Sequence, residues 1–73
     1  MTTPNPLADE LLQARRLLRA GQLQQAIDLL QNLPEIHKNE DGLLLLGMIS
    51  FRAGQLEAAR TAFETLTRDF PQC

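Results

Sequence analysis

A pentapeptide that occurs twice constrains the fold of this chain more than any other feature. The sequence Arg-Ala-Gly-Gln-Leu stands at residues 19–23 and again at residues 52–56, and the offset between the copies is here called the repeat period. Ala26 recurs as Ala59 at the same offset. Repeats with a period of about 20–50 residues are typical of units that stack and bury a continuous core between neighbours. We therefore expect two similar units packed side by side.

The first copy has the pattern of two helices joined by a tight turn. Asn5 can cap a helix whose first residue is Pro6. Apolar residues then recur at helical spacing, at Leu7, Leu11, Ala14 and Leu18. Gly21 supplies the left-handed conformation that ends a helix, and a second helix runs from Leu23 until Pro34 stops it.

The second copy has the same pattern after a connector at residues 35–39. Asn39 can cap a third helix, and Gly54 ends that helix as Gly21 ends the first. A fourth helix is expected from Leu56 to about Asp69, with apolar residues at helical spacing along it. The sequence thus predicts two helix-turn-helix hairpins.

Composition supports a small, all-α protein. The 73 residues include no Val, Trp or Tyr and only three aromatic residues, all Phe, whereas Leu, Ala, Gln, Glu and Arg are good helix formers. A chain of this length forms one domain at most. We predict an N-terminal tail at 1–6 and one domain at 7–73, with hairpins at about 7–33 and 39–70.

These residues resemble the tetratricopeptide repeat. The second copy has the family's order of a large residue, Leu-Gly, a turn glycine, Ala, Phe and a final Pro, at Leu43, Leu46, Gly47, Gly54, Ala59, Phe63 and Pro71. Ser50 stands where the family has an aromatic residue. The first copy keeps the pattern less closely, with Ala14, Ala26 and Leu30 in place but Glu10, Gln13 and Lys38 departing from it.

The resemblance covers Leu7 to Pro71 and implies two antiparallel hairpins stacked as a short α-solenoid. It also places small residues such as Gly47 and Ala59 where helices cross closely. The alternative is a plain bundle of four amphipathic helices. The identical pentapeptides favour the repeat family.

Charge, apolar runs and cysteine content exclude several classes of partner and location. A net charge of −2 gives no basic field for nucleic acid. The longest apolar run, at 43–51, is far below the ~20 residues that span a bilayer, so no membrane insertion is expected. Residues 1–5 do not resemble a signal peptide, and a single cysteine suits a reducing compartment. We expect a soluble cytoplasmic protein.

No residue pattern indicates catalysis, a metal or a cofactor. The one histidine, His37, lies in the connector and has no set of partners that would make a zinc site. Cys73, at the C-terminus, has no base implied nearby and is interpreted as an unreactive thiol. We therefore predict that the chain is not an enzyme and needs no cofactor.

The resemblance implies that another protein binds the first helix of each hairpin, because these helices line the concave face of the family's solenoids. The segment 43–51 is apolar on almost every side, so part of it must be buried by a neighbour or offered to a partner. The predicted groove holds Leu11, Arg15, Leu18, Arg19, Leu44, Met48, Phe51 and Arg52, together with Asp41. Such a groove suits an apolar helical or extended segment with some acidic character. The alternative is that Leu44, Met48 and Phe51 are ordinary core.

Two hairpins are fewer than the three or more units that usually make a stable stack. The last helix should leave Phe63, Leu66 and Phe70 partly uncovered, and we expect a homo-oligomer, most simply a homodimer. The leading hypothesis for function is an adaptor or small chaperone that holds a segment of a partner protein. The alternatives are a structural homo-oligomerisation module, or the start of a longer protein of the family with no ligand of its own.

Overall fold

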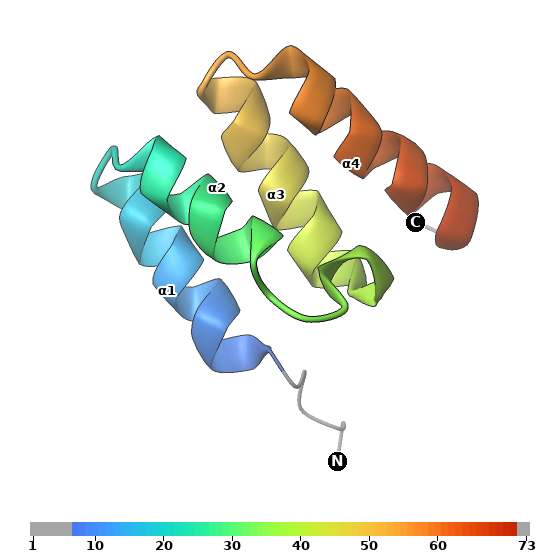
Figure 1. The fold of residues 1–73 in the computed structure, drawn as a ribbon, viewed down its shortest axis with the longest axis horizontal. Helices are drawn as coiled ribbons and strands as arrows, with labels where there is room; N and C mark the ends of the chain where they lie inside the picture. The colour runs from blue at the N-terminus through green and yellow to red at the C-terminus, as the bar shows by residue number, and fades with distance from the viewer. Residues whose placement is uncertain (1–6, 72–73) are drawn as a thin grey trace.

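The computed structural model describes residues 7–71, and they form an all-helical structure without a strand in that range (Figure 1). The elements in chain order are α1 (Ala8–Arg19), α2 (Leu23–Gln31), the short 3-10 helix η1 (Ile36–Lys38), α3 (Glu40–Arg52) and α4 (Leu56–Asp69). Helices α1 and α2 form one antiparallel hairpin, and α3 and α4 form the other (Figure 1). The predicted all-α class and the hairpin solenoid are confirmed.

The two copies of the pentapeptide form the same turn. Gly21 and Gly54 have φ angles of 77° and 79°, in the left-handed region that glycine adopts without a steric penalty. The amide of Gly21 donates to Leu18 O at 3.0 Å, and the next amide, of Gln22, donates to Leu17 O at 2.9 Å. The second turn repeats both bonds at the equivalent residues. This Schellman arrangement satisfies carbonyls at the helix end, as the glycines predicted.

Only one predicted N-cap is observed among the described residues. The side chain of Asn39 accepts a hydrogen bond from the Gly42 amide at 2.9 Å, which confirms the expected cap of α3. Helix α1 begins at Ala8, and the predicted cap Asn5 and first residue Pro6 lie outside the described residues. Helix α2 ends at Gln31, shortly before Pro34.

The connector between the hairpins is more ordered than the sequence indicates. Glu35 adopts a left-handed conformation with a φ angle of 57°, and the chain then forms η1. This turn directs Ile36 inward, where it is buried and contacts Gly42 at the start of α3. The connector therefore contributes a core residue and packs against both α3 and α4.

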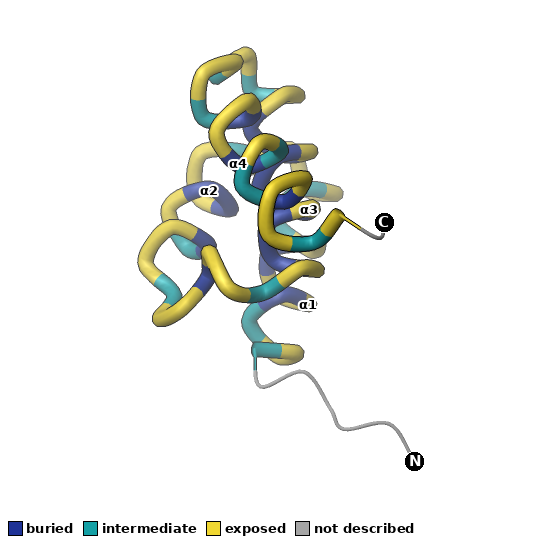
Figure 2. Tube along the Cα trace, turned by 90° about the vertical axis from the view of Figure 1, so that its right-hand side faces the viewer, coloured by how far each residue is buried: buried dark blue, intermediate teal, exposed yellow. Residues whose placement is uncertain are grey.

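Helix α3 is the centre of the molecule. It packs against α4 in its own hairpin and against α1 and α2 of the other (Figure 1). In the rotated view α1 and α3 lie on one side of the molecule and α2 on the other (Figure 2). Because α1 and α3 run in the same direction, residues at equivalent positions of the two helices face the same way.

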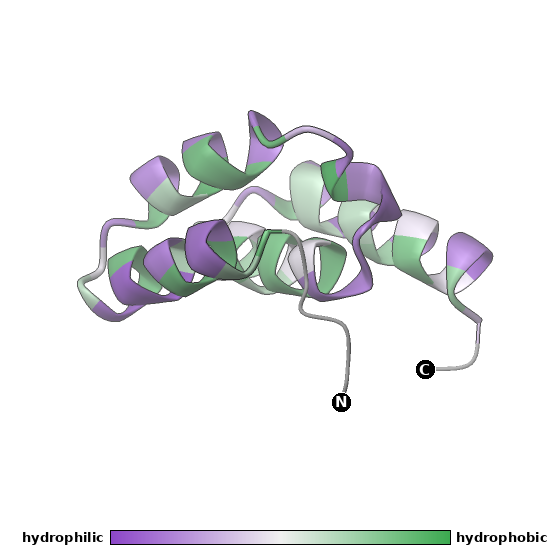
Figure 3. Cartoon of the chain, turned by 90° about the horizontal axis from the view of Figure 1, so that it is seen from below, coloured by the Kyte–Doolittle hydropathy of each residue, from purple (hydrophilic) through white to green (hydrophobic). Residues whose placement is uncertain are grey.

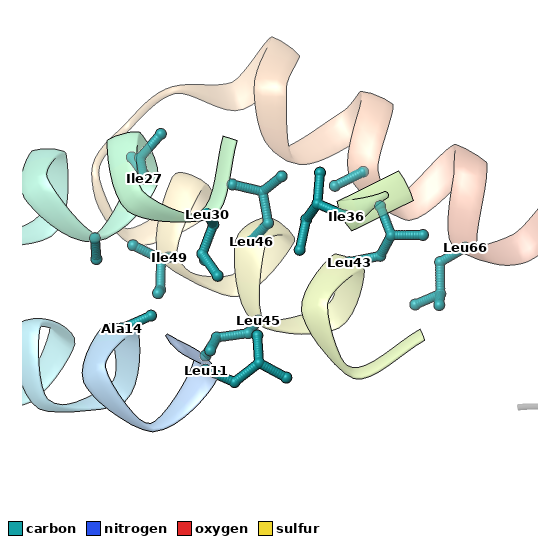
Figure 4. Close-up of a cluster of buried hydrophobic side chains, with 12 residues drawn as sticks. Leu11, Ala14, Ile27, Leu30, Ile36, Leu43, Leu45, Leu46, Ile49 and Leu66 are labelled. Carbon is teal, nitrogen blue, oxygen red and sulfur yellow. The ribbon is translucent and has the colours of Figure 1, made fainter. Parts of the chain in front are cut away.

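The core fills the space between these helices (Figure 4). Its large side chains Ile27, Leu30 and Ile49 are fully buried, and so is the small polar side chain of Ser50. A Cβ added to Gly47 would lie 2.7 Å from the ring of Phe63, so the absence of a side chain allows α3 and α4 to approach. Ala59 is also buried, as expected for a residue at a helix crossing.

Candidate protein-binding surface

The predicted groove residues on α3 are exposed. Leu44, Met48 and Phe51 are 44%, 41% and 64% exposed, whereas their neighbours Leu45, Leu46 and Ile49 are buried. Arg52 is exposed directly after Phe51, and Asp41 is exposed in the first turn. Helix α3 has apolar residues on nearly all sides, but its neighbours cover only part of its surface. Leu44, Met48 and Phe51 are therefore not core residues of this chain.

The predicted groove residues on α1 are divided between surface and core. Arg15 and Arg19 are exposed, and Leu18 is half-buried. Leu11 is only 5% exposed and belongs to the core, so its assignment to the groove is wrong. Its side chain lies beside that of Leu45 between α1 and α3, where a ligand does not reach it (Figure 4).

The repeat period explains why equivalent residues differ in exposure. Leu44 and Phe51 occupy in the second hairpin the positions that Leu11 and Leu18 occupy in the first. The second hairpin packs against the first and covers these positions, whereas within residues 7–71 no element follows that covers the second hairpin. On the last two helices this uncovered surface, here called the C-terminal end face, consists of Leu44, Phe51, Leu56, Arg60 and Phe63.

A different surface is exposed in both hairpins, so stacking of one hairpin on the other leaves it open. Ala8, Arg15 and Arg19 of α1 correspond to Asp41, Met48 and Arg52 of α3, and all six are exposed. Because α1 and α3 are adjacent and parallel, these residues lie on one side of the molecule. This surface, here called the open face, has an apolar side chain at Met48, three arginines and one aspartate. Figure 3 shows hydrophilic residues next to hydrophobic ones along the helical ribbons.

The three residues predicted for self-association are covered to different degrees. Leu66 is buried in the core, so its expected exposure is wrong. Helix α4 is packed on one side by η1, an element that the sequence did not predict. Phe63 and Phe70 are half-buried. Phe63 lines a hollow of about 400 Å³ on the outer side of α4 together with Arg60, Glu64, Thr67 and Arg68.

The other candidate groups lie apart from these surfaces. His37 is exposed in η1, and the described residues contain no group of three side chains that could hold a metal ion. Cys73 lies outside the described residues. Within residues 7–71 no helix has both the length and the apolar character needed to cross a membrane.

Comparison with known proteins decides the family. The family model described as tetratricopeptide repeat matches residues 17–73, which is most of the chain. The chain belongs to the tetratricopeptide repeat family. Proteins of this family are typically interaction modules without catalytic activity, so the repeat indicates protein partners. No curated protein and no solved structure matches the chain closely enough to count as similar.

Sequence reasoning missed two exposed leucines of this tetratricopeptide repeat chain. Leu56 is 60% exposed at the start of α4, and Leu12 is 46% exposed on α1. The repeat could have indicated both. Leu56 corresponds to Leu23 and Leu12 corresponds to Leu45, and both of these equivalents face the boundary between the hairpins. Helical periodicity marks an apolar position, but only its place in the stack shows whether a neighbour covers it.

Proposed function

We propose that the chain is a protein-interaction module that binds a helical, acidic segment of a partner protein along the open face. The observation that supports the proposal is the exposure of Met48 next to Arg15, Arg19 and Arg52 on two adjacent, parallel helices. A flexible thioether adapts to an apolar anchor of the partner, and the arginines favour carboxylates around it. An amphipathic helix fits such a surface because its anchors recur every three or four residues.

Charge favours an acidic partner over a basic one. The open face carries three arginines and one aspartate, although the whole chain has a net charge of −2. Exposed charges of this kind mainly increase association rate and selectivity, and salt screens them. A role as an adaptor and a role as a small chaperone both use such a surface. They differ in whether the bound segment is folded outside the complex.

The proposal can be tested with helical peptides selected from a display library for binding to the chain. Met48→Asp should weaken a selected peptide by about 1–3 kcal/mol, because apolar anchors at the centre of an interface usually dominate binding. Arg15→Glu should weaken it more at low salt than at high salt. Arg68→Glu, on the outer side of α4, is the matched control and should have little effect.

Circular dichroism of the same samples separates lost binding from lost structure. Met48 is exposed, so Met48→Asp should retain the helical signal, whereas Leu46→Asp should unfold the chain because Leu46 is buried. Selected peptides that are rich in basic residues, or that bind Met48→Asp as well as the original chain, would show that the open face is not the binding surface.

A further inference from the structure

We infer that copies of this chain associate head to tail, with the C-terminal end face of one copy packing on the α1–α2 end of the next. The contact would repeat, between molecules, the contact that the two hairpins make within one molecule. It involves other surfaces than the open face, so it goes beyond the proposed function. Three observations support a second copy as the occupant.

The first observation is a pair of exposed leucines at equivalent positions. Within the chain Leu45 lies beside Leu11, and both are buried between α1 and α3 (Figure 4). One repeat period away, the equivalent of Leu45 is Leu12 and the equivalent of Leu11 is Leu44. In a head-to-tail contact, Leu44 of one copy would therefore lie beside Leu12 of the next. Leu12 and Leu44 are 46% and 44% exposed in the single chain. A head-to-tail contact would cover both of them.

The second observation is a hydrogen bond across the boundary between the hairpins. The side-chain amide of Gln55 donates to the side-chain oxygen of Gln24. One repeat period away, the donor position is Gln22 and the acceptor position is Glu57. Gln22 retains the donor group and Glu57 offers a carboxylate, so the bond can form between two copies.

The third observation is an aromatic side chain at one end and a hollow with apolar residues at the other. A hollow of about 510 Å³ at the α1–α2 end is lined by Gln13, Leu17, Asp28, Leu29, Asn32 and Leu33, together with Gln25. Phe63 stands at the position of Leu30, which is fully buried against the second hairpin, and so would face this hollow. Arg60 and Arg68 lie beside Phe63, but each pairs with a carboxylate, Arg60 with Glu64 at 3.1 Å and Arg68 with Asp69 at 3.2 Å, so the contact depends on Phe63 more than on charge.

One pair of positions weakens this contact relative to the internal one. Ile27 and Ile49 are fully buried in the core of the chain. Their equivalents at the two ends are Arg60 and Arg16, which are both exposed and carry the same charge. Head-to-tail association should therefore be weak and should depend on concentration. Because the two contacting surfaces differ, it should also be open-ended and not stop at a dimer.

The experiment is sedimentation velocity of the chain over a range of concentrations, with variants of each end. The average mass should rise steadily without a plateau at two copies. Arg16→Ile together with Arg60→Ile should strengthen association about tenfold or more, because each change restores the internal residue type. Met48→Asp, on the open face, should leave association unchanged, so failure of the proposed function can be distinguished from failure of this inference.

Mixing two variants tests the polarity of the contact. Leu12→Asp blocks the α1–α2 end and Leu44→Asp blocks the C-terminal end face, so each variant alone should be monomeric. A mixture should give a one-to-one complex, because one intact end of each kind remains. A dimer that Leu12→Asp leaves intact would instead be a symmetric pair of C-terminal end faces and would overturn the inference. If the variant with both Arg16→Ile and Arg60→Ile also stays monomeric, the inference is overturned as well.

Discussion

The two hairpins share a turn and a period, yet they differ in how much of each is buried. Helix α1 has two buried residues, Leu11 and Ala14, whereas α3 has seven. The turns after these helices are nearly identical, with φ angles of 77° and 79° at their glycines. Local sequence thus determines the turn, while burial depends on the neighbours that each helix has. Equivalent residues should therefore respond alike to mutation at the turns and differently on the helix faces.

The largest expected contrast is between Ile27 and its equivalent Arg60. Ile27 is fully buried, and Ile27→Ala should destabilise the chain by about 2–5 kcal/mol through lost burial and a cavity. Arg60 is exposed, and Arg60→Ala should change stability by about 0.5 kcal/mol or less. Chemical denaturation of a dilute sample measures both. Similar losses for the two variants would mean that Arg60 has a packing role which its exposure does not suggest.

A second contrast concerns the crossing of α3 and α4. Gly47→Ala places a Cβ 2.7 Å from the ring of Phe63 and should cost about 1–3 kcal/mol by overpacking, and Gly47→Leu should cost more. The first hairpin already has Ala14 at this position, opposite the smaller Leu30. Phe63→Leu should therefore relieve much of the cost of Gly47→Ala. If the double variant is as unstable as the sum of the single variants, the two residues do not interact.

The turns should behave alike. Gly21→Ala and Gly54→Ala each force a left-handed conformation on a residue with a Cβ, and each should cost about 1–2 kcal/mol. A Cβ at either position would meet no atom within 4 Å, so the cost should come from the backbone and not from a clash. Thermal denaturation of the two variants tests this. A loss that differs by more than a factor of two would show that the surrounding hairpin also matters.

A further contrast is a gain in stability at Ser50. Its hydroxyl is fully buried and has no hydrogen-bond partner. Ser50→Ala should stabilise the chain by about 1 kcal/mol, because it removes a polar group that is buried without compensation. The equivalent residue in the first hairpin is Leu17, which is half-buried, and Leu17→Ala should be destabilising instead. A loss of stability in Ser50→Ala would indicate that the hydroxyl is bonded in solution.

The sequence predicts the elements of this fold well because their signals are local. The glycines at both turns and the Asn39 cap act within a few residues, and each is observed where it was expected. The order of elements follows from the identical pentapeptides. The short helix η1 was missed for two reasons. Glu35 adopts a left-handed conformation, which glycine usually indicates in a sequence, and Ile36 does not belong to an apolar pattern with helical spacing.

The candidate surface was predicted less well because it depends on contacts between elements. Leu11 and Leu44 have the same residue type and the same position in the period, yet one is buried and the other exposed. A helical pattern cannot distinguish them without knowing that α3 covers α1 and that no further hairpin in the described chain covers α3. Arg15 and Met48 were assigned to the groove from the family resemblance, and both are exposed because their position in the period is open in both hairpins.

The inward turn at Ile36 has a consequence for how the molecule unfolds. Repeat proteins can lose their units one at a time when each unit contacts only its neighbour through a modest interface. Here the segment between the hairpins is itself packed against α3 and α4, and Ile36 contacts Gly42 under the Asn39 cap. Opening the second hairpin would therefore disturb the connector as well, and α3 also packs against α1 and α2, so that one core spans both hairpins. The protein should unfold as a single cooperative unit, with the slowest-exchanging amides of both hairpins reporting the same opening free energy.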